Sequence, residues 1–370
     1  MKIIHCADLH LDSALTTHLD REKAKDRKQE LLKTFLDMVR YAGENGVSAI
    51  IIAGDMFDTK RVSAHARNAV YDTICDYPDI DFYYLKGNHD VDGFLDSIPE
   101  IPSNLKLFGD EWTKYYITLN TGRNICIAGV TLSPENSGSI YSALILDPAD
   151  INIVTLHGQT SEYRSKDKAE VIDLGSLRNK NIDYLALGHI HAYRKDDLPP
   201  RGVYCYPGCL EGRGFDECGN HGFELIDIDE STMTLTSEFI YFAKRTLYEI
   251  PVDITGCAST IQIQSRIDDA LDDSDCMEDD MVRIVLTGSV DIDCEKNVDA
   301  LLSVNKGRYY LMKIDDETKL AINYDDFALD ASLKGEFVRL LKSDESLSEE
   351  EKTLIIRCGI QALSGEEIEL

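Results

Sequence analysis

Histidine, aspartate and asparagine residues follow five short apolar segments in the first half of the chain. Five of the nine histidines belong to these sets. Such residue types are ligands of hard or borderline divalent cations, for example Mn²⁺, Fe²⁺ or Zn²⁺, and no thiolate is among them. The candidate ligands and acid–base groups are Asp8 and His10, Asp55 and Asp58, Asn88 and His89, His157, and His189 and His191.

The apolar segments have the length and β-branched composition of buried strands. Stretches with helical spacing separate them, so the alternation predicts a layered α/β sheet. In an open α/β sheet ligands bind beyond the carboxyl ends of the strands, and the five sets can therefore converge on one crevice. The expected strands are 3–7, 49–53, 82–86, 151–156 and 184–187, and the expected helices are 21–42 and 61–75.

The spacing within two of the sets supports a shared site. Asp8 and His10 are two residues apart, as are His189 and His191, which places both side chains of each pair on one face of an extended chain. A single Asp-x-His or His-x-His is usually only a detail of a surface or a core. Five sets in order, each after an apolar segment, indicate a metal site instead.

Seven candidate ligands are too many for one cation. Two cations about 4 Å apart, bridged by one carboxylate and a hydroxide, fit this number. Such a pair lowers the pKa of bound water and holds both sides of an in-line displacement at phosphorus. The residues therefore predict hydrolysis of a phosphate ester, with the bridging hydroxide as the nucleophile.

The five sets, read as Asp-x-His, Gly-Asp-x-x-Asp, Gly-Asn-His-Asp, His and Gly-His-x-His, resemble the signature of the calcineurin-like metallophosphoesterase superfamily. The resemblance implies an α/β/β/α-type sheet sandwich and a role for each residue. One metal would be held by Asp8, His10 and His191, the other by Asn88, His157 and His189, with Asp55 bridging them. His89 would protonate the leaving oxygen or stabilise its charge, and Asp58 would orient His89.

Two further stretches narrow the resemblance to the DNA double-strand-break repair exonuclease branch of the superfamily. They are His-Cys-Ala-Asp-Leu-His-Leu-Asp at 5–12 and Tyr-Pro-Gly at 206–208 followed by Glu-Gly-Arg-Gly-Phe-Asp-Glu at 211–217. The similarity extends over about residues 1–230. It implies a nuclease with two divalent metal ions, Mn²⁺ ahead of Mg²⁺, Fe²⁺ and Zn²⁺, a coiled-coil ATPase partner, and a homodimer formed through the helices of the first domain.

The rest of the chain predicts a smaller α/β module and a helical tail. Strands are expected at 233–242, 247–254, 281–286 and 309–314, and helices at 258–271, 298–304 and 348–363. We therefore expect three parts: a metallophosphoesterase catalytic domain at 1–242, a small α/β capping domain at 243–325, and a C-terminal helical tail at 326–370.

The net charge of −29 is the main evidence against a polyanionic substrate. Residues 1–230 hold 24 Lys and Arg against 37 Asp and Glu, and residues 231–370 hold 14 against 30. DNA binding needs Lys and Arg to neutralise phosphates. The local candidates, each of which could equally be a solvated face, are Arg21, Lys23, Lys25, Arg27, Lys28, Arg164, Lys166, Lys168, Arg178, Lys180, Arg194, Lys195 and Arg213.

Two other functions therefore stay open beside a DNA repair exonuclease. One is a phosphodiesterase or phosphatase that acts on small nucleotides or other organophosphates. The other is a non-catalytic scaffold that binds partners through its acidic cap and tail. The ten scattered cysteines are typical of reduced thiols, and no apolar run approaches the ~18 residues of a membrane span. We expect a cytoplasmic protein without a membrane partner.

Overall fold

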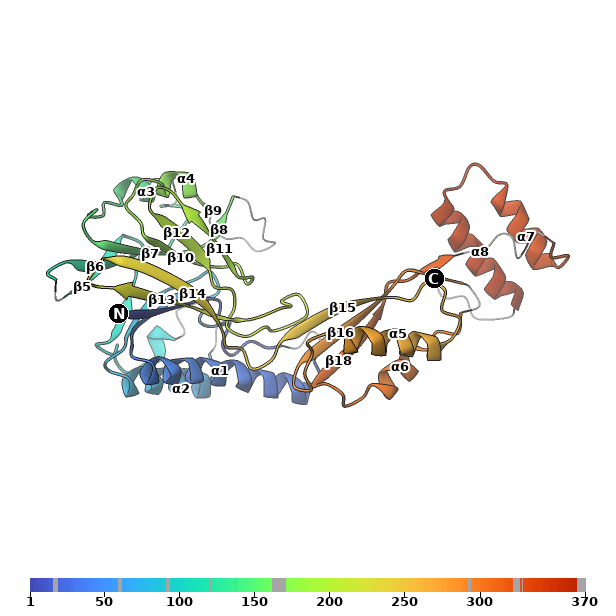
Figure 1. The fold of residues 1–370 in the computed structure, drawn as a ribbon, viewed down its shortest axis with the longest axis horizontal. Helices are drawn as coiled ribbons and strands as arrows, with labels where there is room; N and C mark the ends of the chain where they lie inside the picture. The colour runs from blue at the N-terminus through green and yellow to red at the C-terminus, as the bar shows by residue number, and fades with distance from the viewer. Residues whose placement is uncertain are drawn as a thin grey trace. The chain divides into compact units, whose positions relative to one another are not determined.

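Two six-stranded sheets form the first of two compact units, which comprise residues 1–246 and 247–370 (Figure 1). The computed structural model describes residues 1–15, 19–58, 62–90, 94–119, 121–136, 138–161, 171–291, 294–321, 327 and 329–364. The first sheet has the order β14 (Thr234–Tyr241), β13 (Gly222–Asp229), β1 (Lys2–Cys6), β2 (Val47–Ala53), β3 (Asp81–Leu85), β4 (Leu105–Leu107). Strands β1 to β4 are parallel, and β13 is antiparallel to both of its neighbours.

The second sheet also has a parallel centre, but both of its edge strands are antiparallel to their neighbours. Strands β12, β10, β7 and β6 run parallel, whereas β11 and β5 are antiparallel to their neighbours. Its order is β11 (Arg194–Leu198), β12 (Gly202–Tyr206), β10 (Tyr184–Gly188), β7 (Ile151–His157), β6 (Asn124–Gly129), β5 (Thr113–Thr118). A short parallel pair, β8 (Gln159–Thr160) and β9 (Val171–Ile172), lies apart from it.

The two sheets pack face to face, and helices cover their outer faces. Along β2 the side chains alternate: Ile51 belongs to the core between the sheets, while Ile50 and Ile52 belong to the core under the helices. Helices α1 (Arg21–Glu44) and α2 (Ala64–Asp76) cover the first sheet, and α3 (Ile140–Ala143) and α4 (Leu174–Leu177) cover the second. The expected α/β/β/α layering is confirmed.

The second unit is a small α/β module with a helical pair at its end. Strands β15, β16 and β18 form a parallel sheet, and apolar residues of α5 and α6 form one core with it. Helices α7 and α8 pack on each other through Val338, Leu341, Ile356 and Ile360. The bounds are β15 Leu247–Asp253, α5 Thr260–Asp272, β16 Met281–Thr287, β17 Ser289–Asp291, α6 Val298–Val304, β18 Leu311–Asp316, β19 Lys319–Ala321, α7 Leu333–Lys342 and α8 Glu349–Ser364.

The strands and helices expected beyond residue 230 are all present within a few residues of their expected ends. Helix α7 was not expected. The expected limit between cap and tail at residue 325 lies outside the described residues, so this division stays a prediction. None of the ten cysteines, all of which are described, forms a disulfide. Among the described helices none has the length and apolar character needed to cross a membrane.

Candidate metal centre

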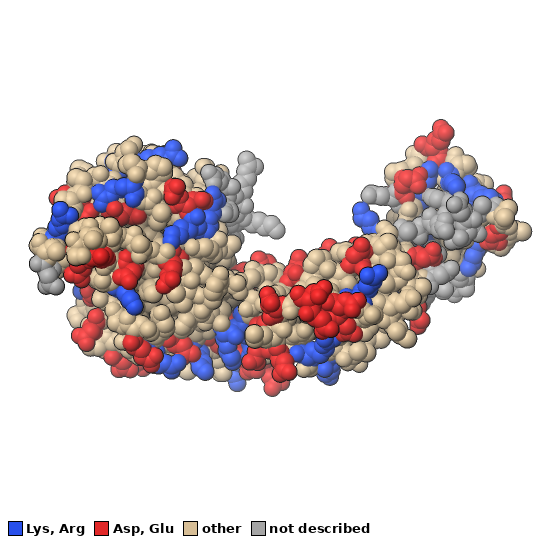
Figure 2. Space-filling model, viewed as in Figure 1, with Lys and Arg blue, Asp and Glu red and all other residues tan. Residues whose placement is uncertain are grey.

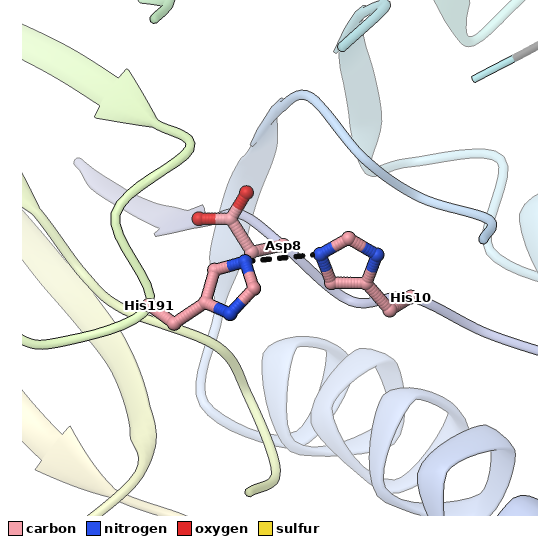
Figure 3. Close-up of side chains that lie close together, drawn as sticks. All are labelled: Asp8, His10 and His191. Carbon is pink, nitrogen blue, oxygen red and sulfur yellow. Dashed lines mark hydrogen bonds between the residues drawn. The ribbon is translucent and has the colours of Figure 1, made fainter. Parts of the chain in front are cut away.

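Three side chains from the two sheets form the first group of candidate ligands. Asp8 and His10 follow β1, His191 follows β10, and one ligand atom from each lies within 4.8 Å of the others (Figure 3). The Nε2 atoms of His10 and His191 are only 3.1 Å apart. Asp8 and His10 are almost fully buried. Two imidazole nitrogens and a carboxylate that converge in this way form three corners of a cation site.

The second group lies at the ends of three strands. Asp55, His157 and His189 offer ligand atoms within 4.8 Å of one another. The Oδ1 atom of Asn88 is 2.9 Å from His157 Nε2 and 3.2 Å from His189 Nδ1. His157 Nδ1–H donates to the carbonyl oxygen of Ala53 at 2.9 Å. This bond leaves the Nε2 lone pair of the neutral imidazole directed at the group, as a metal ligand requires.

The carboxylate of Asp55 lies between the two groups. Its Oδ2 atom is 3.3 Å from His157 Nε2 in the second group and 3.9 Å from His10 Nε2 in the first. The other oxygen, Oδ1, accepts a hydrogen bond from the backbone N–H of His89 at 2.8 Å. Asp55 is therefore placed where one carboxylate could contact two cations.

His89 and Asp58 form a pair beside the two groups. The Nδ1 atom of His89 is 3.0 Å from Asp58 Oδ1, and the Ser13 hydroxyl donates to Asp58 Oδ2 at 2.7 Å. Asp58 Oδ1 is also 3.5 Å from His10 Nδ1. The His89 side chain is 36% exposed, so part of the ring is open to solvent. This is the geometry of an oriented acid–base group.

The backbone of four candidate ligands adopts the left-handed region, which non-glycine residues rarely occupy. The φ angles are +51° for Asp8, +42° for His10, +51° for Asp55 and +102° for His189. Such conformations cost about 1–3 kcal/mol each and persist where the surrounding structure holds them, often at functional sites. Hydrogen bonds hold these turns, because the N–H groups of Asp8 and His10 donate to the carbonyl oxygens of Gly54 and Asp55.

Close packing around the ligands explains two of the glycines in the motifs. A Cβ atom on Gly87 would lie 2.1 Å from Asp55 Oδ1, and one on Gly54 would lie 2.1 Å from His157 Nδ1. No side chain fits at either position without displacing a candidate ligand. The loops are also joined by Asp90, whose carboxylate accepts hydrogen bonds from the backbone N–H groups of Met56, Phe57 and Gly87.

The electrostatics keep Asp55 and Asp58 ionised, whereas burial raises the pKa of Asp8 above its usual value. Burial by itself would raise the pKa of Asp55, but the neighbouring His157 and His10 hold that pKa well below its usual range. Burial would lower the pKa of His157, and the carboxylate of Asp55 outweighs burial and raises it to about 9. Hydrogen bonds from His10, His89 and Ser13 likewise outweigh burial at Asp58 and lower its pKa. The negative charge of Asp55 that favours a proton on His157 would equally attract a metal cation, which would take the place of that proton.

The structure thus brings together all nine residues that the sequence singled out. The donors are carboxylate, amide and imidazole groups in two adjoining sets, which fits two hard or borderline divalent cations. Sequence reasoning missed Glu217, whose carboxylate accepts a hydrogen bond from His191 Nδ1–H at 2.6 Å. The sequence offered one indication, which is the spacing of four residues between Arg213 and Glu217. In the structure these two side chains form an ion pair at 2.7 Å.

Several of the basic residues proposed for DNA binding are engaged in ion pairs. Lys28 pairs with Asp12 at 2.8 Å, and Lys195 pairs with the buried Glu224 at 2.7 Å. Arg27 is fully buried and cannot contact a ligand from solvent. The candidates Arg164, Lys166 and Lys168 lie outside the described residues.

A layered sandwich with two adjoining groups of candidate metal ligands at the ends of its strands is typical of a metallophosphoesterase. The sequence profile of the calcineurin-like phosphoesterases (Metallophos) matches residues 1–193. This match covers more than half of the 370 residues, so the chain belongs to the calcineurin-like phosphoesterase family. The resemblance seen in the sequence is confirmed at this level.

Three relatives are modestly similar. The chain is 26% identical over 280 residues to the uncharacterized metallophosphoesterase YhaO of Bacillus subtilis, covering 73% of this chain and 67% of that protein. It is 26% identical over 255 residues to the DNA double-strand break repair protein Mre11 of Methanopyrus kandleri, covering 62% of this chain and 54% of the relative. It is 25% identical over 387 residues to the DNA double-strand break repair protein Mre11 of Saccharolobus solfataricus, covering 100% of this chain and 96% of that protein. The chain thus spans about half of the Methanopyrus protein.

Proposed function

We propose that this family member is a two-metal hydrolase of phosphodiester bonds and that its substrate is DNA, which it degrades as a repair exonuclease. The observation that carries the two-metal part is the position of Asp55, whose Oδ2 lies 3.9 Å from His10 in one ligand group and 3.3 Å from His157 in the other. One carboxylate between two ligand groups suits a pair of cations about 4 Å apart.

Two divalent cations held by these seven side chains, Mn²⁺ being the first candidate, would supply the Lewis acidity and the acidified water that phosphoester hydrolysis needs. The protein contributes orientation and protons. Asp58 accepts from His89 Nδ1–H and fixes the imidazole, so that Nε2 can carry a proton to the leaving oxygen. The Asp8 carboxylate is held by the backbone N–H of His189 at 2.9 Å, which fixes its oxygens toward the first group.

Exposed aromatic side chains beside the centre support a nucleic acid substrate. Tyr193 lies two residues after His191, its ring 4.4 Å from that of Phe239, and Tyr241 lies 5.2 Å from Phe239. Tyr193 is 42% and Tyr241 69% exposed. The register of β1, β13 and β14 places Tyr241 at the same sheet edge as Asp8. Nucleobases stack on such rings with little regard to sequence, and the two Mre11 relatives carry names of DNA repair proteins.

The second candidate is a hydrolase of small nucleotides or other organophosphates. The net charge of −29 and the ion-paired basic residues favour it, because a long polyanion gains little from such a surface. A non-catalytic scaffold is less well supported, since all seven candidate ligands are present and brought together. The coiled-coil ATPase partner and the homodimer remain proposals that rest on the family resemblance.

A substrate panel separates the two enzymatic candidates. Purified protein with Mn²⁺ is given linear duplex DNA, single-stranded DNA, a cyclic nucleotide and bis(nitrophenyl) phosphate. We expect release of nucleotides from DNA ends, activity that falls steeply with salt, and no activity with chelator. Turnover of the small esters without DNA cleavage under any divalent metal would select the second candidate.

A further inference from the structure

We propose that Arg213 binds the phosphoryl oxygens of the substrate and that Glu217 holds both Arg213 and His191 in place. The proposal rests on the two-metal function above and deepens it. Both residues lie in the loop between β12 and β13, and Figure 3 shows where His191 meets Asp8 and His10. Asp8 and His10 follow a strand of the first sheet, and His191 follows a strand of the second. The loop contacts His191 and so positions the third member of this ligand group.

Glu217 is the centre of a dense set of hydrogen bonds. Its Oε1 atom accepts from His191 Nδ1–H at 2.6 Å and from Arg213 Nη2 at 2.7 Å. Its Oε2 atom accepts from the Arg213 backbone N–H at 2.8 Å. The side chain is only 5% exposed. Both carboxylate oxygens therefore accept hydrogen bonds, and one of the donors is the positively charged guanidinium of Arg213.

A carboxylate can only accept hydrogen bonds, and this decides the tautomer of His191. Nδ1 must carry the proton, so in the neutral ring Nε2 is the atom with a free lone pair. That Nε2 is the atom 3.1 Å from His10 Nε2. A carboxylate behind a metal-bound histidine fixes the ring and raises its basicity, and losing such a partner typically weakens metal binding 10- to 100-fold.

Arg213 spans the two halves of the centre. Its Nη2 atom is 3.2 Å from His191 Nδ1, and its Nη1 atom is 3.7 Å from Asp58 Oδ2. The distance to Asp58 is too long for a strong hydrogen bond. Among the described residues Nη1 has no closer hydrogen-bond acceptor, and the side chain is 20% exposed. A planar guanidinium with a donor left over, between a ligand group and an acid–base pair, matches a phosphoryl oxygen.

The loop is anchored from behind by a buried ion-pair network on α1. Arg27 is fully buried and donates from Nη1 to Glu211 Oε1 at 2.9 Å and from Nη2 to the carbonyl oxygen of Gly212 at 2.6 Å. The Thr34 hydroxyl donates to Glu211 Oε2 at 2.9 Å. This network holds the backbone of Gly212, the residue before Arg213. The Arg213 side chain is therefore attached to a fixed backbone, and its guanidinium loses little conformational freedom on binding phosphate.

The two roles predict that substitution of Glu217 weakens metal binding, whereas substitution of Arg213 weakens phosphate binding. In Glu217→Gln, Mn²⁺ binding measured by calorimetry should weaken 10- to 100-fold for one of two ions, because His191 loses its anionic partner. In Arg213→Met, Mn²⁺ should bind at least as tightly, since a cation beside the site is removed. The inhibition constant of inorganic phosphate should instead rise, and kcat/KM for bis(nitrophenyl) phosphate should fall, each by about 10- to 100-fold. Arg213→Lys should recover part of this loss.

The control is Arg283→Met, because Arg283 pairs with Glu249 and Asp315 in the second unit at 2.8 and 2.6 Å. It should change neither metal nor phosphate binding. Unchanged phosphate inhibition in Arg213→Met, or unchanged Mn²⁺ affinity in Glu217→Gln with normal thermal stability, would overturn the proposal while leaving the two-metal function standing. Wild-type protein that binds no Mn²⁺ and hydrolyses no ester would remove the function itself.

Discussion

The two units of the chain treat their acidic residues in opposite ways. In the first unit a few carboxylates are buried among histidines at the ends of strands, where Asp8 and Asp55 are 1% exposed. In the second unit carboxylates are denser in sequence and many lie at the surface, as the visible face in Figure 2 shows. There they form ion pairs with basic side chains, as Asp315 does with Arg283. Others accept hydrogen bonds from neighbouring hydroxyl groups, as Asp253 does from Thr255.

Both groups of candidate metal ligands lie in the first unit, as does the set of His10, Asp58 and His89 beside them. The nine histidines also lie there, the last being His221. A metal centre therefore follows from where strands end and from which donors are buried together, and the number of carboxylates in a region does not predict it. The following substitutions test this contrast.

The largest effect is expected at the carboxylate between the ligand groups. Asp55→Asn keeps the shape of the side chain but removes the charge that contacts both groups, so hydrolysis of bis(nitrophenyl) phosphate with Mn²⁺ should fall by about 10³-fold or more. The matched control is Asp315→Asn in the second unit, which should leave the initial rate unchanged. Equal effects of the two substitutions would show that the contrast between the units is wrong.

A smaller and substrate-dependent effect is expected at His89. Without its proton, departure of a deoxyribose oxygen from DNA should slow by about 10²-fold, a usual value for a lost general acid. Bis(nitrophenyl) phosphate should be affected much less in His89→Asn, because nitrophenolate leaves without a proton. Rates on both substrates give the ratio directly. A loss of the same size on both would indicate that His89 acts in another way, for example by holding Asp58.

Much of this centre could be predicted because each ligand set is a local pattern. An apolar strand followed by Asp-x-His or Gly-Asn-His-Asp needs only a few adjacent residues to be recognised, and the carboxyl edges of parallel strands bring such sets together. The contact of His191 with Glu217 joins residues 26 apart, and that of Arg27 with Glu211 joins residues 184 apart. Such pairs depend on how loops and helices pack, which a single sequence does not contain.

The buried strands β6 and β13 were also not predicted, but three other missed elements share a physical reason. Helix α7 has ten residues and its buried side chains are few, so its amphipathic signal is short. The edge strands β4 and β11 bury only part of their side chains, and a strand with weak alternation resembles a loop. In contrast, β2 buries nearly every residue because it lies between the helices and the second sheet, and its continuous apolar run indicates a central strand.

A pH effect from a buried histidine should appear in the first unit, where all nine histidines lie. His5 is fully buried between the sheets, where its Nδ1 lies 2.9 Å from the Tyr184 hydroxyl, and burial lowers its pKa from 6.5 to about 3. As pH falls below 6.5, the unfolded chain takes up a proton that folded His5 excludes. The free energy of unfolding should therefore fall, by up to about 1.4 kcal/mol per pH unit from this group.

The single tryptophan makes this measurable, because Trp112 lies in the first unit and its fluorescence in urea reports that unit. The difference in unfolding free energy between wild type and His5→Gln should shrink by about 2 kcal/mol between pH 6.5 and 5. His65→Gln, on the exposed side of α2, should keep the wild-type slope. A His5→Gln slope equal to that of wild type would contradict the assignment.

The smallest effect is expected in the second unit, at a position without chemistry. Asn297 precedes α6, and its Oδ1 accepts from the Ala300 backbone N–H at 2.9 Å. Asn297→Ala should destabilise this helix by about 1 kcal/mol, whereas Asn297→Ser, which can still cap it, should not. Amide exchange in α6 should be faster only in the alanine variant. Because no candidate ligand of the described residues lies in this unit, Mn²⁺ affinity and ester turnover should stay at wild-type values in both variants. A fall in turnover with the faster exchange would mean that the acidic unit takes part in the chemistry of the first.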